Sequence, residues 1–421
     1  MNSDKVVLDS LFKSENINHK KNDTFYFIPN PDSTIRWIYP KSLKKPSFLS
    51  FYSTSSTRAK ILASIFRLSF YFRLNKKIEL EVFKDSIIDR IIKQYKDFNY
   101  SIFTGTIGIN RKAIIELNQN NSTKYFVKVA LTEQSKDLIN NEKTILNKLN
   151  KYPYQSLTIP KIIESDKDYI TIDNIAPKNQ TQSSTLNEIH LNALDEIYSK
   201  TIDTKSIQDS TYFEVIKENI AVLSNRSLNK NFNKNKIENL IKNMKTILES
   251  LNTEKEISFA YGHNDFTPWN MFVENNHLYL FDWELAKNDI VLLYDFFHFI
   301  FQSQILISKS DYKSIYEVIV TLIKNNSRLK DIVQQYNIDK LYWYFLLDQI
   351  GKYKRGKNFD AISCMKVLMF WLHQEEISPV EALPEAAQNT VEKIYNEIKQ
   401  VDPYDTTFIY GLESLTETDF Y

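Results

Sequence analysis

The stretch YGHNDFTPWNMF, residues 261–272, gathers several polar side chains into one short segment. Asp265 and Asn270 are five residues apart with Pro268 between them, so they cannot lie on successive turns of one helix. An irregular loop can instead aim both side chains at one point. The segment that follows, MFVENNHLYLFDW, has two β-type runs around a turn at ENNH and predicts a hairpin. Because a hairpin brings its ends together, we expect Asp282 to return close to Asn270.

The oxygen-bearing side chains of this segment predict a metal-assisted site. The amide of Asn270 and the carboxylate of Asp282 suit a hard cation such as Mg²⁺, which takes a few protein oxygens together with water and substrate phosphates. Asp265 would then be placed to orient an attacking hydroxyl and to accept its proton. We expect His263 to brace the loop through hydrogen bonds, with a catalytic role as the alternative. Further side chains could line an acceptor pocket, with core packing as the alternative for the two tryptophans: Trp269, Trp283 and Glu284.

A second group of residues lies upstream, around a predicted helix over residues 136–149. The apolar residues of this helix form one stripe, and Glu142 sits at the centre of it. A carboxylate on a buried stripe is costly unless a cation pairs with it. The nearest preceding candidate is Lys128, in the predicted strand YFVKVA. Such a pair would hold the ammonium where phosphate oxygens can bind it. The alternative is that Glu142 reaches solvent and Lys128 is an ordinary exposed strand residue.

The region before this helix predicts a small sheet. Residues 98–130 contain three β-type runs, separated by a break and by the turn NQNNST. Gly105 and Gly108 fall in the break, where small residues let backbone N–H groups approach phosphates closely. The ordinary alternative is that these two glycines only form a turn.

The elements along the chain predict an α+β fold with two lobes and an N-terminal extension. Residues 1–95 form the extension, which is basic and partly helical, and residues 96–178 form a small antiparallel-sheet lobe with one helix. Residues 179–421 form a larger, mainly helical lobe with a C-terminal tail. The candidate site residues fall where the two lobes would meet.

The extension contains an unusually one-sided charge pattern. Residues 36–77 carry ten Lys and Arg residues and no acidic residue. Within this segment, AKILASIFRLSFYFRL is apolar on most sides from Ile61 to Leu74. One interpretation is a buried helix packed on a neighbouring domain. The other is a segment that lies on a membrane surface or grips an anionic, lipid-like substrate.

Composition excludes several other classes of protein. The 421-residue chain has a formal net charge of +1, so no overall field favours nucleic acid, and we expect no nucleic-acid partner. A single cysteine excludes an internal disulfide and a zinc site built on paired cysteines. The start MNSDKVVLDS lacks the features of a signal peptide, and no apolar run reaches the roughly 18–20 residues that span a bilayer. We expect a cytoplasmic protein, with a membrane-peripheral location as the alternative.

The motifs resemble those of a known group of enzymes. HNDFTPWN, followed after a hairpin by FDWE, resembles the catalytic and metal motifs of the aminoglycoside phosphotransferase and choline kinase group, within the protein-kinase-like superfamily. The usual pattern of the group is H-G-D-x-x-x-x-N, and Asn264 stands here in place of the glycine. Lys128 and Glu142 match the phosphate-binding lysine and the helix glutamate of the group. The resemblance covers residues 98–375, and we place no counterpart for residues 1–95.

The resemblance implies a bilobal protein-kinase-like fold and a small-molecule kinase. The connector YITIDNIAPKN would bind the adenine through its backbone near Asp173 and Asn174, and Asp295 would brace the catalytic region. ATP, with GTP not excluded, would act together with Mg²⁺. The acceptor would be a hydroxyl group on a sugar, an amino alcohol or an aminoglycoside-like molecule.

Besides a protein-substrate kinase, for which nothing in the chain resembles the activation segment of such enzymes, two other functions stay open at the level of sequence. The first is a non-catalytic nucleotide-binding or regulatory protein that keeps the kinase fold. The second is a membrane-peripheral protein that acts on a lipid-linked glycan through its basic extension. The intact set of Lys128, Asp265, Asn270 and Asp282 favours a catalyst over the first of these.

Overall fold

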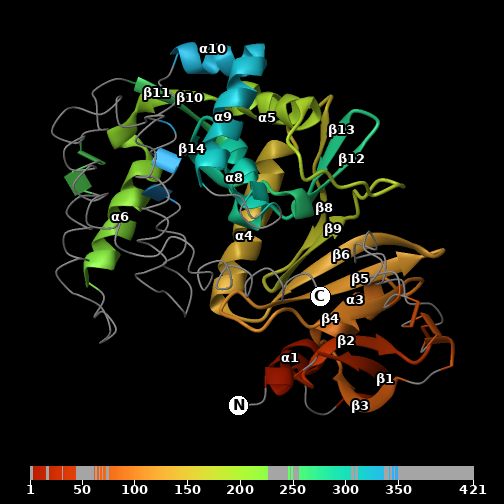
Figure 1. Ribbon diagram of the computed structural model, residues 1–421. Helices are drawn as coiled ribbons and strands as arrows, with labels where there is room; N and C mark the ends of the chain where they lie inside the picture. Colours follow the sequence, from red (N-terminus) through yellow and green to blue (C-terminus); the bar gives the residue numbers. More distant parts are fainter. Residues whose placement is uncertain are drawn as a thin grey trace.

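The structure is a computed structural model with a sheet-rich part and a helix-rich part (Figure 1). It describes residues 3–15, 19–30, 32–43, 75–225, 256–304 and 312–335, together with scattered positions at 61–72, 245–249, 308 and 341–348.

An eight-stranded antiparallel sheet forms the small lobe, in the order β3-β1-β2-β4-β5-β6-β9-β8. Its strands are β1 (Lys20–Pro29), β2 (Ile35–Pro40), β3 (Lys76–Phe83), β4 (Asn99–Phe103), β5 (Lys112–Gln119), β6 (Ser122–Ala130), β8 (Ile162–Ser165) and β9 (Tyr169–Asp173). Three helices accompany the sheet: α1 (Ser3–Phe12), α3 (Ile87–Gln94) and α4 (Glu133–Leu149). The three strands predicted over residues 98–130 and the helix predicted over residues 136–149 are all present.

The N-terminal extension is continuous with this sheet. Strand β2 pairs with β4 through Trp37 and Phe103, which joins β1–β3 to the lobe. One buried apolar cluster contains Val7 from α1, Ile88 from α3 and Ile115 from β5. The extension and the lobe therefore share a core, although the sequence could place no counterpart for the extension.

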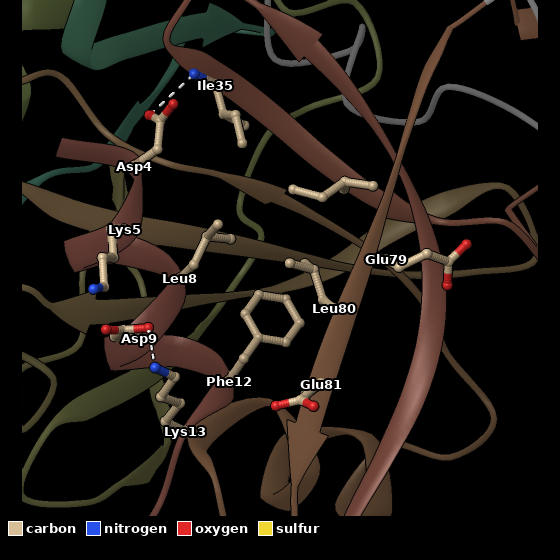
Figure 2. Close-up of a pocket in the computed structure, with 11 residues that line it drawn as sticks. Asp4, Lys5, Leu8, Asp9, Phe12, Lys13, Ile35, Glu79, Leu80 and Glu81 are labelled. Carbon is tan, nitrogen blue, oxygen red and sulfur yellow. Dashed lines mark hydrogen bonds and ion pairs between the residues drawn. The ribbon is translucent and has the colours of Figure 1, made fainter. Parts of the chain in front are cut away.

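Helix α1 and strand β3 border a pocket of about 390 Å³ (Figure 2). Apolar side chains including Leu8, Phe12 and Leu80 line it, with charged residues such as Lys13 and Glu81 around them. This pocket belongs to the extension and contains none of the predicted site residues.

The apolar segment of the extension is exposed where the structure describes it. The described residues at 61–71 are helical, and Ile61, Ile65 and Leu68 are more than half exposed. At 100° per residue these three share one face of a helix, with Phe70 opposite them. Phe70 is buried, and its ring stacks on Tyr39 with centroids 4.4 Å apart. The interpretation of this segment as a buried helix is therefore wrong for these positions, where only the side that carries Phe70 is packed.

The larger lobe combines helices with two short sheets. Its described helices are α5 (Glu188–Thr201), α6 (Thr211–Asn225), α8 (Tyr294–Gln302), α9 (Tyr312–Asn325) and α10 (Ser327–Gln335). One sheet contains β10 (Asp203–Ser206), β11 (Glu256–Gly262) and β14 (Lys287–Val291), and the other contains β12 (Met271–Glu274), β13 (His277–Leu280) and β7 (Leu157–Thr158). Short 3₁₀ turns are η2 (Ile207–Asp209), η3 (Pro268–Asn270) and η4 (Trp283–Leu285).

Helix α4 connects the two lobes, since its residues Ile139 and Ile145 belong to the same buried cluster as Phe266 and Trp283 of the larger lobe. The two-lobed α+β architecture predicted from the sequence, with an antiparallel-sheet lobe and a mainly helical lobe, is confirmed. Within the described part of the chain, no helix is long and apolar enough to cross a membrane.

Candidate active site

The loop after β11 is fixed from behind by Asp295 at the start of α8. The backbone N–H of His263 donates to Asp295 Oδ2 at 2.7 Å, and that of Asn264 donates to Oδ1 at 2.8 Å. Burial raises the pKa of this carboxyl group, while the nearby imidazole of His263 and these two hydrogen bonds oppose the rise. The predicted bracing contact of Asp295 is thus present.

Asn264 explains how the chain can depart from the usual glycine. Its φ is 64°, in the left-handed region, which asparagine tolerates better than most residues with a side chain. The side-chain amide of Asn264 also donates to the carbonyl of Leu285 at 2.9 Å, which ties the loop to the turn η4. Asn264 therefore adopts a left-handed backbone conformation, and its side chain anchors the loop.

Asp265 lies at the centre of a small hydrogen-bond network. The amide of Asn270 donates to Asp265 Oδ2 at 2.8 Å, and His298 Nε2 lies 3.3 Å from Oδ1. Burial would raise the pKa of Asp265, but the hydrogen bond from His298 and the nearby imidazoles of His298 and His263 hold this pKa below its usual value. The carboxylate is therefore available as a proton acceptor at neutral pH.

His298 was missed by the sequence analysis. It lies on α8 three residues after Asp295, a spacing that places both side chains on the same side of the helix. Because Asp295 was expected to brace the loop that carries Asp265, this spacing was a usable signal for His298.

The predicted hairpin returns the chain as expected. Met271 pairs with Leu280 across β12 and β13, and the N–H of Phe281 donates to the carbonyl of Asn270 at 3.0 Å. His263 Nε2 donates in turn to the carbonyl of Phe281 at 2.9 Å, which is the bracing role predicted for this histidine. The side-chain amide of Asn270 donates to Asp265 in this structure. The convergence of the Asn270 and Asp282 side chains on one metal ion therefore stays a prediction.

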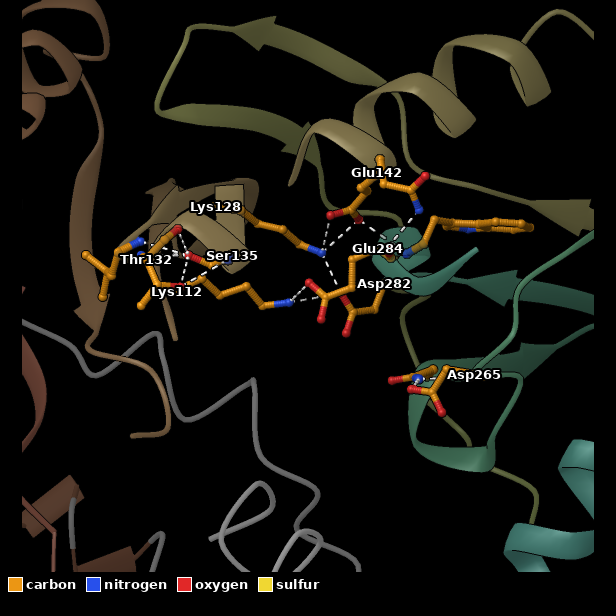
Figure 3. Close-up of polar contacts among 12 residues, drawn as sticks. Lys112, Lys128, Thr132, Ser135, Glu142, Asp265, Asp282 and Glu284 are labelled. Carbon is orange, nitrogen blue, oxygen red and sulfur yellow. Dashed lines mark hydrogen bonds and ion pairs between the residues drawn. The ribbon is translucent and has the colours of Figure 1, made fainter. Parts of the chain in front are cut away.

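Lys128 occupies the contact that the sequence predicted for it. Its Nζ donates to both oxygens of Glu142, at 2.7 and 2.8 Å, and to Asp282 Oδ1 at 2.6 Å (Figure 3). Burial works against the charge of Lys128, but the carboxylates of Asp282 and Glu142 outweigh it and raise its pKa. The exposed-residue alternative is excluded, since Glu142 is fully buried.

A second lysine, which the sequence analysis did not select, joins this cluster. Lys112 on β5 forms an ion pair with Glu284, and its Nζ lies 3.5 Å from Asp282 Oδ1. Burial and the charge of Asp282 raise the pKa of Glu284, against the opposing charges of Lys112 and Lys128. Glu284, one of the side chains considered for an acceptor pocket, thus forms its ion pair with a lysine of the small lobe. Trp283, beside it, is fully buried and packs in the core.

The charges of the cluster fit a bound divalent cation. Oxygens of Glu142, Asp282 and Glu284 lie within 4.8 Å of one another, and two ammonium groups face these three carboxylates. One negative charge is left without a counterpart in a largely buried site, which favours an added cation. The Asp282 side chain is 32% exposed, which makes it the most exposed carboxylate of the three.

Gly105 and Gly108, which lie between β4 and β5, differ in whether a residue with a side chain would fit in their place. Gly105 has a φ of 74°, and a Cβ there would lie 1.9 Å from the carbonyl oxygen of Lys112. A Cβ on Gly108 would have nothing within 4 Å. The tight turn therefore accounts for Gly105, and a phosphate-binding role for both glycines stays a prediction.

The connector after β9 has part of its backbone already engaged. The N–H of Asp173 donates to the carbonyl of Lys161 at 3.1 Å, and that of Asn174 donates to the carbonyl of Lys124 at 2.8 Å. A base bound beside these two residues would have to use other groups of the connector. The adenine-binding role assigned to this region stays a prediction, and the backbone N–H groups of Asp173 and Asn174 are already used in other hydrogen bonds.

Comparison with known proteins gives similarity at the level of structure. No protein-family model matches the sequence, and no curated protein matches it. The chain is similar to the ADP-bound aminoglycoside phosphotransferase APH(2'')-Ib, with 16% identity and a TM-score of 0.42, over 73% of this chain and 97% of that chain. It is also similar to choline kinase LicA from Streptococcus pneumoniae, with 16% identity and a TM-score of 0.39, over 74% of this chain and 98% of that chain. These proteins are of the group that the sequence motifs resemble.

Proposed function

We propose that this protein is a small-molecule kinase that transfers the γ-phosphoryl group of ATP to a hydroxyl group. The observation that carries the proposal is the buried contact of Lys128 with both Glu142 and Asp282. A lysine held between a helix carboxylate and a partly exposed carboxylate is suited to bind phosphate oxygens beside a metal ion.

The phosphates would be bound by Lys128, which Glu142 holds in position. In a largely buried site the attraction between an ammonium group and phosphate oxygens is weakly screened. Mg²⁺, when bound, would neutralise charge on the phosphates, and Asn270 and Asp282 are the residues that would hold it. The backbone around Gly105 and Gly108 would contribute N–H groups to the phosphates.

Asp265 would act as the catalytic base. It would accept the proton of the acceptor hydroxyl as the new oxygen–phosphorus bond forms and the bond to the bridging oxygen of the donor breaks, releasing ADP. The hydrogen bonds from Asn270 and His298 support this role, because they fix the carboxylate and favour its ionised form.

A transfer assay tests the proposal. Purified protein is incubated with Mg²⁺ and γ-labelled ATP or GTP, against a panel of sugars, amino alcohols and aminoglycosides, and phosphorylated products are identified by mass spectrometry. We expect transfer to one class of acceptor by the wild type and none by Asp265→Asn. ATP binding without Asp265-dependent transfer to any acceptor would favour a non-catalytic nucleotide-binding protein instead.

A peripheral contact with an anionic membrane surface is a second candidate function, for residues 36–77. It is favoured by the exposed apolar side chains Ile61, Ile65 and Leu68, in a segment without acidic residues. Such a contact would bring a lipid-linked acceptor to the enzyme. We expect the wild type to float with phosphatidylglycerol vesicles and Ile65→Asp to stay unbound. Equal flotation of both proteins would contradict the contact.

A further inference from the structure

We propose that Lys112 is a second phosphate-binding lysine, which Glu284 holds in position as Glu142 holds Lys128. This inference rests on the proposed kinase function and adds a nucleotide-binding residue to it.

The sheet places the two lysines on the same face. Ile114 lies directly opposite Lys128 across β5 and β6, and Lys112 lies opposite Ala130. Directly opposite residues of an antiparallel pair point to the same side, and so do residues two apart in one strand. Lys112 and Lys128 are therefore diagonal neighbours, and both reach from the sheet toward the carboxylates that follow β13 (Figure 3).

The two ammonium groups also share one carboxylate oxygen. Asp282 Oδ1 is 2.6 Å from Lys128 Nζ and 3.5 Å from Lys112 Nζ. Asp282 is the most exposed of the three carboxylates and would hold the metal ion, whose charge would draw the terminal phosphates of the nucleotide to this place. A polyphosphate bound at Lys128 and at the metal must therefore also lie beside Lys112.

Helix α4 positions both lysine–carboxylate pairs. Glu142 contacts Lys128 directly, and the neighbouring Asn141 donates through its amide to the carbonyl of Glu284 at 2.9 Å. One helix thus fixes the side chain of the first carboxylate and the main chain of the second. The carboxylate partners of Lys112 and Lys128 are therefore both held in place by helix α4.

Lys112 has donor capacity for a phosphate. An ammonium group can donate three hydrogen bonds. Within the described part of the chain, its contacts are the carboxylates of Glu284 and Asp282. Lys112 could exchange its 3.5 Å contact with Asp282 for a phosphate oxygen while it keeps its contact with Glu284.

Calorimetric titration of the full-length protein with ATP, ADP and AMP tests the inference without measuring turnover. We expect Lys112→Met to weaken ATP binding about 10- to 100-fold, as for the loss of a hydrogen bond between charged groups, and to change AMP binding by less than about twofold. Lys112→Arg should stay within about fivefold of the wild type. Lys96→Met, which removes an exposed lysine that belongs to none of the predicted site groups, is the control and should bind as the wild type does.

The outcomes separate this inference from the proposed function. Wild-type ATP affinity in Lys112→Met would overturn the role of Lys112 and leave the kinase proposal intact. Absence of ATP binding by the wild type would overturn both. If thermal melting shows that Lys112→Met is unfolded, Glu284→Gln replaces it. That variant keeps the lysine but loosens its support, so ATP affinity should fall several-fold, and an unchanged affinity would overturn the inference.

Discussion

Replacement of Glu142 by alanine is the strongest test of the buried contact between the lobes. The change removes the carboxylate that accepts two hydrogen bonds from Lys128 and one, at 3.3 Å, from the backbone N–H of Trp283. Lys128 then remains largely buried with one fewer counter-charge.

The expected loss of stability depends on the contact that Lys128 retains with Asp282 in this variant. Breaking a buried ion pair by removing one partner costs about 3–5 kcal/mol, because an uncompensated charge stays behind. Here Asp282 still contacts Lys128 at 2.6 Å, so we expect a loss near the lower end, about 3 kcal/mol in the free energy of unfolding. Adding Lys128→Met to Glu142→Ala removes the stranded charge, and the double variant should recover part of the loss.

Urea unfolding followed by tryptophan fluorescence measures this loss, since Trp283 lies next to the pair. Asp137→Ala, an exposed carboxylate on the same helix, is the control and should change stability by less than about 0.5 kcal/mol. A loss below about 1 kcal/mol for Glu142→Ala, or a double variant less stable than the single one, would refute the reasoning.

Three further predictions concern the stability of the fold and the rate of phosphoryl transfer. Burial lowers the pKa of His190 to about 4 in the fold, so the unfolded chain binds a proton at this histidine at higher pH than the folded chain does. The free energy of unfolding should therefore fall by about 3 kcal/mol as the pH drops from about 6.5 to 4. His190→Gln should remove this contribution, as measured by urea unfolding at several pH values. His298→Leu should lower kcat about tenfold or more with an unchanged KM for ATP, since Asp265 loses a hydrogen bond, and equal changes in both constants would contradict this. Gly105→Ala should lower the thermal stability clearly, because its φ is positive and β5 lies against it, while Gly108→Ala should have little effect.

The sequence predicted the contacts that depend on local patterns. Glu142 interrupts the apolar stripe of a helix, and this conflict required a cation, which Lys128 supplies. The hairpin before Asp282 follows from two β-type runs around a short turn, and its geometry determines where Asp282 lies. In each case the signal lies within a few residues of the element that it describes.

Lys112 could not be found in this way, because a bulge sets the register of its strand. The pairing of β5 with β6 shifts between Leu117 and Asn118. A regular hairpin without this shift would place Ala113 opposite Lys128 and turn Lys112 to the other face of the sheet. A single inserted residue thus decides whether Lys112 reaches the site, and the sequence carries no clear sign of it.

The place of the extension was hidden for a related reason. Strands β1 to β3 join the sheet through pairings between residues far apart in the chain, such as Trp37 with Phe103. Hydrophobic patterning indicates a strand but not its partner, so the shared core was not evident from the sequence.

The rate of phosphoryl transfer by Asp265→Asn is the measurement that tests the central claim most directly. With an acceptor identified by the panel assay, kcat and the KM for ATP are compared among the wild type, Asp265→Asn and the exposed control Asp137→Asn. A base that acts on the acceptor hydroxyl contributes about 100-fold or more to the rate. We predict that Asp265→Asn loses at least this factor in kcat while its KM for ATP stays within about threefold. A variant that keeps more than about a tenth of the wild-type rate would contradict the assignment of Asp265 as the catalytic base.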